Sequence, residues 1–109
     1  MDKKIQEEYI FEAVTPLKFF VRVSRSYWHY IITIKHPIMA GRENDVQHTL
    51  ENPNEIRISR SDPTVYLFYS QEREKRWVCV VVKWQHENGF VITTYPTDNI
   101  KEGTIIWQK

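Results

Sequence analysis

The stretch from Trp77 to Trp84 (WVCVVVKW) is the most apolar segment of the chain. Its β-branched and aromatic side chains favour an extended strand. Apolar residues at consecutive positions, rather than at every second one, indicate a strand that is covered on both faces. The sequence therefore predicts that Trp77–Trp84 is a central strand, and the rest of the chain must supply its neighbours.

Segments with period-two alternation lie before and after this strand along the chain. They are rich in β-branched and aromatic residues, and turn signals at Asp62-Pro63 and Asn88-Gly89 separate them. The expected strands cover residues 56–59, 64–69, 77–84 and 90–95, with a last edge strand at 105–107. Because each strand follows the previous one after a short loop, we predict a four-stranded antiparallel meander.

Two helices are expected before the meander. The first begins at Ser24 or Ser26, whose hydroxyl can accept a hydrogen bond from an N–H group of the first turn. It ends at His36-Pro37, because proline disfavours continuation of a helix. The second covers Arg42–Glu51 and ends before Pro53.

The chain of 109 residues is expected to form one domain, 1–109, of the α+β class. We predict two N-terminal helices packed on the four-stranded antiparallel sheet, with extra N-terminal edge strands at 9–15 and 18–24. Residues 1–8 are charged and are expected to be a frayed terminus. One face of the sheet is expected to pack on the helices, and the other to stay open.

Composition excludes several classes of protein. No stretch approaches the ~18 apolar residues of a membrane-spanning helix, and the first ten residues lack the apolar region of a signal peptide. The lone Cys79 excludes an internal disulfide and agrees with a reducing compartment. The net charge is only +1, so any contact with nucleic acid has to rely on local positive charge. We expect a cytoplasmic protein that needs no cofactor and no metal; the oligomeric state stays open.

Strand parity assigns the side chains of the sheet to its two faces. Apolar positions are expected on the face toward the helices: Ile56, Ile58, Val78, Val80, Val82, Phe90 and Ile92. Polar or thiol-bearing positions, with two valines, are expected on the open face: Arg57, Ser59, Cys79, Val81, Lys83, Val91, Thr93 and Tyr95. Whether Tyr66 or Tyr69 joins the open face depends on a strand register that the sequence leaves undetermined.

The first helix carries two histidines seven positions apart, His29 and His36. Tyr27, Ile31 and Ile34 follow one another at i, i+4 and i+7, which predicts a packed face of this helix. His29 and His36 are expected near the opposite side, with His36 at the proline-marked helix end.

The two histidines and the polar side chains expected on the open sheet face suit the cleavage of RNA without a metal ion. That reaction needs a base for the 2′-hydroxyl, an acid for the leaving oxygen and cations for the phosphate charge. Histidine suits the first two roles because its ordinary pKa lies near neutrality. The simpler interpretation is that these residues form a solvated sheet face and a histidine on the helix surface. From the composition of the face alone, this interpretation is favoured over a functional site.

The order of segments resembles the barnase–EndoU–colicin–RelE-like nuclease superfamily, from about Phe19 to Trp107. Short motifs carry the resemblance: Trp28-His29, His36-Pro37, Leu50-Glu51-Asn52-Pro53, Val80-Val81-Val82 and Ile92-Thr93-Thr94-Tyr95. It implies a metal-independent ribonuclease, often a toxin or a phage-derived domain, with two helices over a four-stranded antiparallel sheet. RNA and a cognate antitoxin or inhibitor protein are the partners that it implies.

By this resemblance, His36 is the first candidate for acid–base chemistry and His29 the second. Tyr95 and Thr93 would support catalysis, while Arg57, Lys83 and Tyr69 would bind substrate. Two other interpretations stay open. One is a non-catalytic module that binds RNA or protein through the open sheet face, and the other is a subunit of a larger assembly. Whether the chain is an enzyme is therefore not decided by its sequence.

Overall fold

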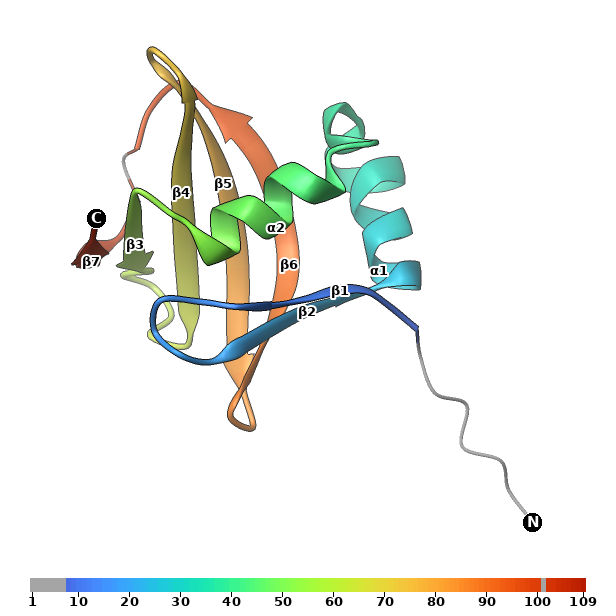
Figure 1. Ribbon diagram of the computed structural model, residues 1–109, viewed down its shortest axis with the longest axis horizontal. Helices are drawn as coiled ribbons and strands as arrows, with labels where there is room; N and C mark the ends of the chain where they lie inside the picture. Colours follow the sequence, from blue (N-terminus) through green and yellow to red (C-terminus); the bar gives the residue numbers. More distant parts are fainter. Residues whose placement is uncertain (1–7, 101) are drawn as a thin grey trace.

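The computed structural model describes residues 8–100 and 102–109, so the expected frayed terminus, except Glu8, lies outside the described residues. The described residues contain one sheet of seven strands: β1 (Tyr9–Val14), β2 (Phe20–Ser24), β3 (Glu55–Ile58), β4 (Val65–Arg73), β5 (Arg76–Gln85), β6 (Asn88–Thr97) and β7 (Thr104–Gln108). The helical elements are α1 (Arg25–Tyr30), the π-helical turn η1 (Ile31–Lys35), the 3₁₀ turn η2 (Pro37–Met39) and α2 (Glu43–Glu51). Figure 1 shows how they are arranged.

The predicted four-stranded antiparallel sheet with two N-terminal helices is wrong. The sheet has seven strands in the order β1-β2-β6-β5-β4-β3-β7, and both helices follow the first two strands. Strands β3 to β6 are antiparallel neighbours, but β2 pairs with β6 in parallel, which makes the sheet mixed. The N-terminal segments are therefore integral strands of the sheet.

The parallel pairing depends on Gly89, which lies opposite Val21. A Cβ atom at Gly89 would lie 2.8 Å from a Val82 methyl and 2.9 Å from a Val21 methyl. The missing side chain lets β2 approach β6. A turn expected over residues 85–89 is confirmed, but its two central residues are His86 and Glu87 rather than the Asn88-Gly89 pair, and both have the positive φ that two-residue hairpins require.

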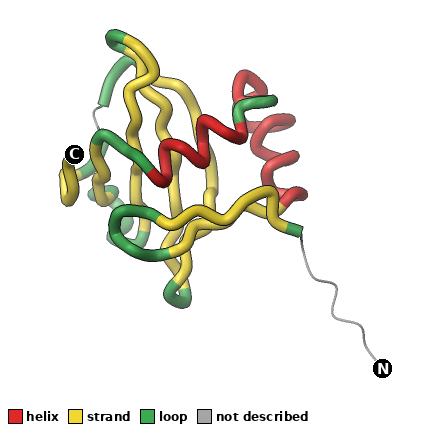
Figure 2. The backbone as a smooth tube through the Cα atoms, viewed as in Figure 1, coloured by secondary structure: helices red, strands yellow, loops and turns green. Residues whose placement is uncertain are grey.

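Helix α2 lies over one face of the strongly curved sheet, whereas α1 and η1 lie beside the β6 edge (Figure 2). Helix α2 runs across β4, β5 and β6, and the β1–β2 hairpin crosses the same strands at a steep angle (Figure 1). The larger core forms between these layers from buried apolar residues: Phe11, Ala13, Val21, Val23, Trp28, Ile31, Met39, Val46, Leu50, Ile56, Phe68, Val78, Val80, Val82 and Val91.

The first helical segment begins where the sequence predicts, since the Ser24 hydroxyl accepts a hydrogen bond from the Tyr27 N–H at 3.1 Å. Trp28 and Ile31 are buried, but Ile34 is 65% exposed, so the expected packed face is wrong at its C-terminal end. The π-helical turn is the reason. It holds more residues per turn than an α-helix, which rotates Ile34 away from the core.

The second face of the sheet is partly covered rather than open. A smaller cluster of Leu67, Tyr69, Cys79 and Val81 is buried there. The predicted faces are wrong at Phe90, Val91 and Ile92, because a β-bulge between Val81 and Val82 shifts the register of β6, so that Val91 pairs with Val82 and Phe90 with Lys83. Val91 therefore joins the larger core, while Ile92 packs against the smaller cluster.

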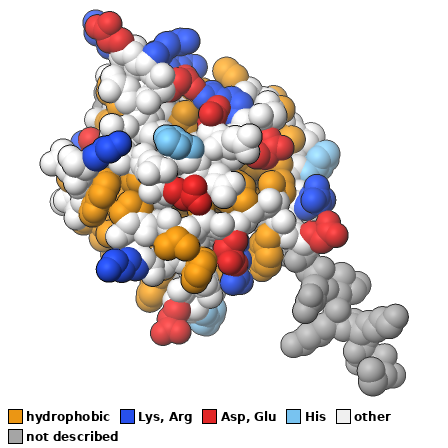
Figure 3. Space-filling model, in the orientation of Figure 1, with side chains coloured by type: hydrophobic (Ala, Val, Ile, Leu, Met, Phe, Trp, Pro, Cys, Tyr) orange, Lys and Arg blue, Asp and Glu red, His pale blue; other side chains and the backbone are white. Residues whose placement is uncertain are grey.

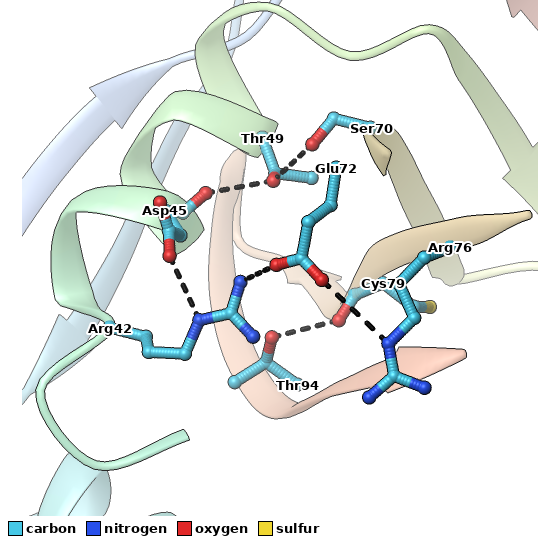
Figure 4. Close-up of polar contacts among 8 residues, drawn as sticks. All are labelled: Arg42, Asp45, Thr49, Ser70, Glu72, Arg76, Cys79 and Thr94. Atoms are coloured by element: carbon cyan, nitrogen blue, oxygen red, sulfur yellow. Dashed lines mark hydrogen bonds and ion pairs between the residues drawn. The ribbon is translucent and has the colours of Figure 1, made fainter. Parts of the chain in front are cut away.

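Polar contacts connect helix α2 and the residue before it to the β4–β5 hairpin (Figure 4). Arg42 forms ion pairs with Asp45 and with Glu72. Deeper in the molecule, the buried hydroxyls of Thr49 and Ser70 lie 2.7 Å apart in a hydrogen bond. These contacts fix the helix-bearing face, over which acidic and basic side chains intermingle (Figure 3). Among the described residues, no helix has the length and apolar character needed to cross a membrane.

Candidate functional site

A cleft of about 310 Å³ lies on the second face of the sheet. It is lined by Tyr69, Tyr95, Thr97, Asn99 and Glu102. Its floor is a row of residues at matching positions on three adjacent strands, because Tyr69 of β4 pairs with Cys79 of β5, which pairs with Tyr95 of β6. The register thus brings two of the predicted site tyrosines to one place, and it is Tyr69 rather than Tyr66 that joins this face.

The two phenols flank the Cys79 position on the neighbouring strands, and their interaction with its thiol lowers the thiol pKa by less than burial raises it. Burial raises the pKa of Tyr69 and of Tyr95 above the ordinary value of a phenol. Burial also raises the pKa of the Cys79 thiol to about 11. All three groups therefore stay protonated at neutral pH, so Tyr95 can donate a hydrogen bond to an anionic ligand but does not act as a base.

His36 lies beside this row, with its ring centroid 5.3 Å from that of Tyr95 and the ring planes at 40°. The backbone on both sides fixes its place. The His36 N–H donates to the Ile31 carbonyl at 2.7 Å, and its own carbonyl accepts from the Met39 N–H at 3.0 Å. At the helix end predicted at His36-Pro37, the His36 imidazole is thus half-buried and packs against Tyr95 of the sheet.

Glu102 lines the cleft and interacts electrostatically with Tyr95, which contributes to the raised pKa of that phenol. One Glu102 carboxylate oxygen accepts a 3.4 Å hydrogen bond from the Ser59 hydroxyl. Tyr95 therefore contacts an imidazole and interacts with a carboxylate, and each of these two group types can transfer a proton.

Arg57 lies on the same face but is already partnered. Its guanidinium forms an ion pair with Glu55 and points a second nitrogen at the carbonyls of Glu102 and Gly103, at 3.5 and 3.4 Å. The positive charge lowers the pKa of nearby Tyr69, although burial of that phenol outweighs it. In this arrangement Arg57 holds the segment around Glu102 in place rather than offering a free charge to a phosphate.

Thr93 lies two residues before Tyr95, on the same face of β6. Its hydroxyl oxygen is buried and, within the described part of the chain, has no hydrogen-bond partner. Such a group is costly to bury without a partner. Thr93 does not line the cleft itself, so it stands next to the other site residues without contacting the open space.

Two predicted site residues lie elsewhere. Lys83 binds Asp62 at 2.9 Å, and along β5 it is four residues from Cys79, about 13 Å away. His29 is exposed and lines a shallow surface depression with Glu8, Arg25 and Ser26. The structure therefore brings together His36, Tyr95 and Tyr69, with Arg57 and Thr93 close by on the same face, but not Lys83 or His29.

Sequence reasoning missed Glu102, Asn99 and Thr97 of the cleft. The strand expected over residues 90–95 continues through Pro96 to Thr97 in β6. Glu55 was also missed, although it stands two residues before Arg57 and shares its face by simple alternation. This alternation is the one signal in the sequence that indicates a place for Glu55 next to Arg57.

Within the described residues, no three His, Cys, Asp or Glu side chains are grouped to hold a metal ion. Comparisons of the chain with protein-family models, with curated proteins and with solved structures found no match.

Proposed function

We propose that this chain is a cytoplasmic, metal-independent ribonuclease of the toxin or phage-derived type, with its site in the second-face cleft. The observation that carries the proposal is the placement of the His36 imidazole 5.3 Å from the Tyr95 ring, with Glu102 on the cleft wall. The resemblance in segment order to the barnase–EndoU–colicin–RelE-like superfamily agrees with it.

Glu102 and Tyr95 of the cleft, together with His36 beside it, have the chemistry for an attack of the RNA 2′-oxygen on the adjacent phosphorus. In this scheme the Glu102 carboxylate takes the 2′-hydroxyl proton, and the imidazolium of His36 gives a proton to the leaving 5′-oxygen. A 2′,3′-cyclic phosphate and a free 5′-hydroxyl result. The neutral Tyr95 phenol donates to a non-bridging phosphate oxygen and stabilises the charge that develops there.

A non-catalytic RNA- or protein-binding module is the second candidate. The observation that favours it is the pairing of both predicted phosphate-binding cations, Arg57 with Glu55 and Lys83 with Asp62. Ion pairs of this kind leave less positive charge for a transition state. Such a module would bind RNA or protein at the same face and leave RNA intact.

The deciding experiment incubates the purified protein with total RNA and with tRNA in the presence of EDTA. The wild-type chain should cleave, whereas His36→Ala and Glu102→Gln should each lose about 10²-fold or more of that activity. His29→Ala is the matched control, because it removes an imidazole outside the cleft, and its activity should stay at the wild-type level. Intact RNA after incubation with the wild-type protein rules out the ribonuclease.

A toxin-type ribonuclease should also arrest growth when it is expressed alone in bacterial cells. The His36→Ala variant should be tolerated at the same expression level. Co-expression of a cognate inhibitor protein, where one exists, should restore growth. Normal growth with abundant folded wild-type protein argues against the toxin class.

A further inference from the structure

A second hollow, of about 360 Å³, lies where α1 meets the edge of β6. Aromatic side chains dominate its wall: Tyr9, Tyr27, Tyr30 and Phe90, with Arg22 and Ile92 beside them. Beyond the short parallel pairing of Gly89 and Phe90 with β2, this edge of β6 faces α1 and η1. Tyr9 and Tyr30 are each 43% exposed, so their rings are accessible to a ligand.

Two cations lie over these aromatic rings. The Lys35 ammonium stands 5.5 Å from the ring centres of both Tyr27 and Tyr30, and the Arg22 guanidinium stands 5.3 Å from that of Tyr9. Arg22 is ion-paired with Glu12. Aromatic faces interleaved with cations are the usual recognition surface for unpaired nucleobases and their phosphates.

Lys35 links this hollow to the cleft. Its ammonium donates to the Ile92 carbonyl at 2.8 Å and to the Tyr27 hydroxyl at 3.2 Å, and an ammonium group has a third N–H for another acceptor. The next residue is His36, whose ring packs on Tyr95. Along β6, Ile92 and Tyr95 are three residues apart, about 10 Å, a separation that a short stretch of single-stranded RNA spans.

We propose that the aromatic hollow is a nucleobase subsite, in which Tyr30 and Tyr9 stack on a base of the single-stranded RNA whose phosphate lies at His36. Lys35 then contacts the phosphate between the two places. This inference rests on the proposed ribonuclease function and extends it, because it makes unpaired RNA the substrate class. An extended peptide along the β6 edge would not require the exposed faces of these rings.

The test measures binding of a fluorescein-labelled single-stranded RNA hexamer by anisotropy, in the His36→Ala background so that the RNA stays intact. Adding Tyr30→Ala should weaken binding by about tenfold, and Tyr9→Ala should act in the same direction. Tyr30→Phe is the matched control, because it keeps the ring face and should bind like the parent. Circular dichroism verifies that each variant is folded.

A second ligand, an abasic ribose-phosphate hexamer, separates stacking from charge. Tyr30→Ala should leave its binding unchanged, whereas Lys35→Gln should weaken binding of both ligands. Equal hexamer affinity in Tyr30→Ala and its parent, or equal losses for the two ligands, overturns the subsite. Absence of cleavage by the wild-type protein, with tyrosine-dependent binding of the hexamer, instead overturns the ribonuclease and leaves the base-binding hollow in place.

Discussion

The rings of His36 and Tyr95 lie 5.3 Å apart at 40°, one at the end of the helical segment and the other on β6. Backbone contacts hold both partners. The His36 N–H closes the π-helical turn on Ile31, and Lys35 at the end of that turn donates to the carbonyl of Ile92 on β6. The imidazole is therefore held beside the cleft by the backbone, before any ligand arrives.

Replacing Tyr95 by Phe should distinguish the contribution of its hydroxyl to RNA cleavage from that of its ring. The ring contact with His36 remains, but the hydroxyl that would donate to a phosphate is lost. We expect RNA cleavage to fall about tenfold, the effect of one hydrogen bond, with a small change in melting temperature. Tyr66→Phe is the control, since Tyr66 packs against the larger core on the other face. Equal activity of Tyr95→Phe and wild type would contradict a role for the hydroxyl.

Gly103→Ala should destabilise the protein strongly. Gly103 has φ of +86°, and an added Cβ would lie 2.6 Å from the Ile58 carbonyl oxygen. Strain and overpacking together should cost about 2–4 kcal/mol of unfolding free energy. Gly41→Ala is the matched control, because φ is +81° there but nothing lies within 4 Å of the new Cβ; it should cost about 1 kcal/mol. Chemical denaturation measures both, and similar losses would contradict the contact argument.

The Asp62 carboxyl should make the free energy of unfolding depend on pH below about pH 4. Hydrogen bonds from Thr64, together with that from Lys83, lower the pKa of this carboxyl from 3.8 to about 2. A lowered folded-state pKa stabilises the fold above about pH 4, and this contribution is lost as the pH falls toward 2. The melting temperatures of wild type and Asp62→Asn should therefore differ at pH 5 and converge near pH 2. A constant difference across this range would exclude the effect.

Cys79 should be unreactive in the folded protein. Its thiol is fully buried, and its pKa is raised to about 11 by that burial, so the thiolate that attacks alkylating agents is scarce at pH 8. Intact mass spectrometry after iodoacetamide treatment should show unmodified protein under native conditions and complete single alkylation in denaturant. Rapid native alkylation would show that the second face opens readily.

Local signals in the sequence were dependable where neighbouring residues alone decide the structure. Ser24 caps α1 through its own hydroxyl, and Val78, Val80 and Val82 face the larger core as alternation requires. Alternation also placed Tyr95 on the second face with Cys79. In these cases the backbone geometry of one turn or one strand is sufficient to determine where the side chain points.

Prediction failed where one residue shifts the period. The π-helical turn exposes Ile34, and the bulge beside Val82 exchanges the faces of Val91 and Ile92. Both irregularities preserve the composition of the segment, so periodicity gives no warning of them.

The sequence alone determined that the chain forms a strand-rich domain around Trp77–Trp84, with a helix ending at His36-Pro37. Only the tertiary structure decided that Gly89 admits β2 as a parallel neighbour of β6, that Tyr95 and Glu102 line one cleft, and that the His36 ring packs on Tyr95 beside it. The physical reason is that short-range backbone preferences fix local elements. The proximity of residues far apart along the chain depends instead on which surfaces pack together, and this is settled only when the whole sheet is assembled.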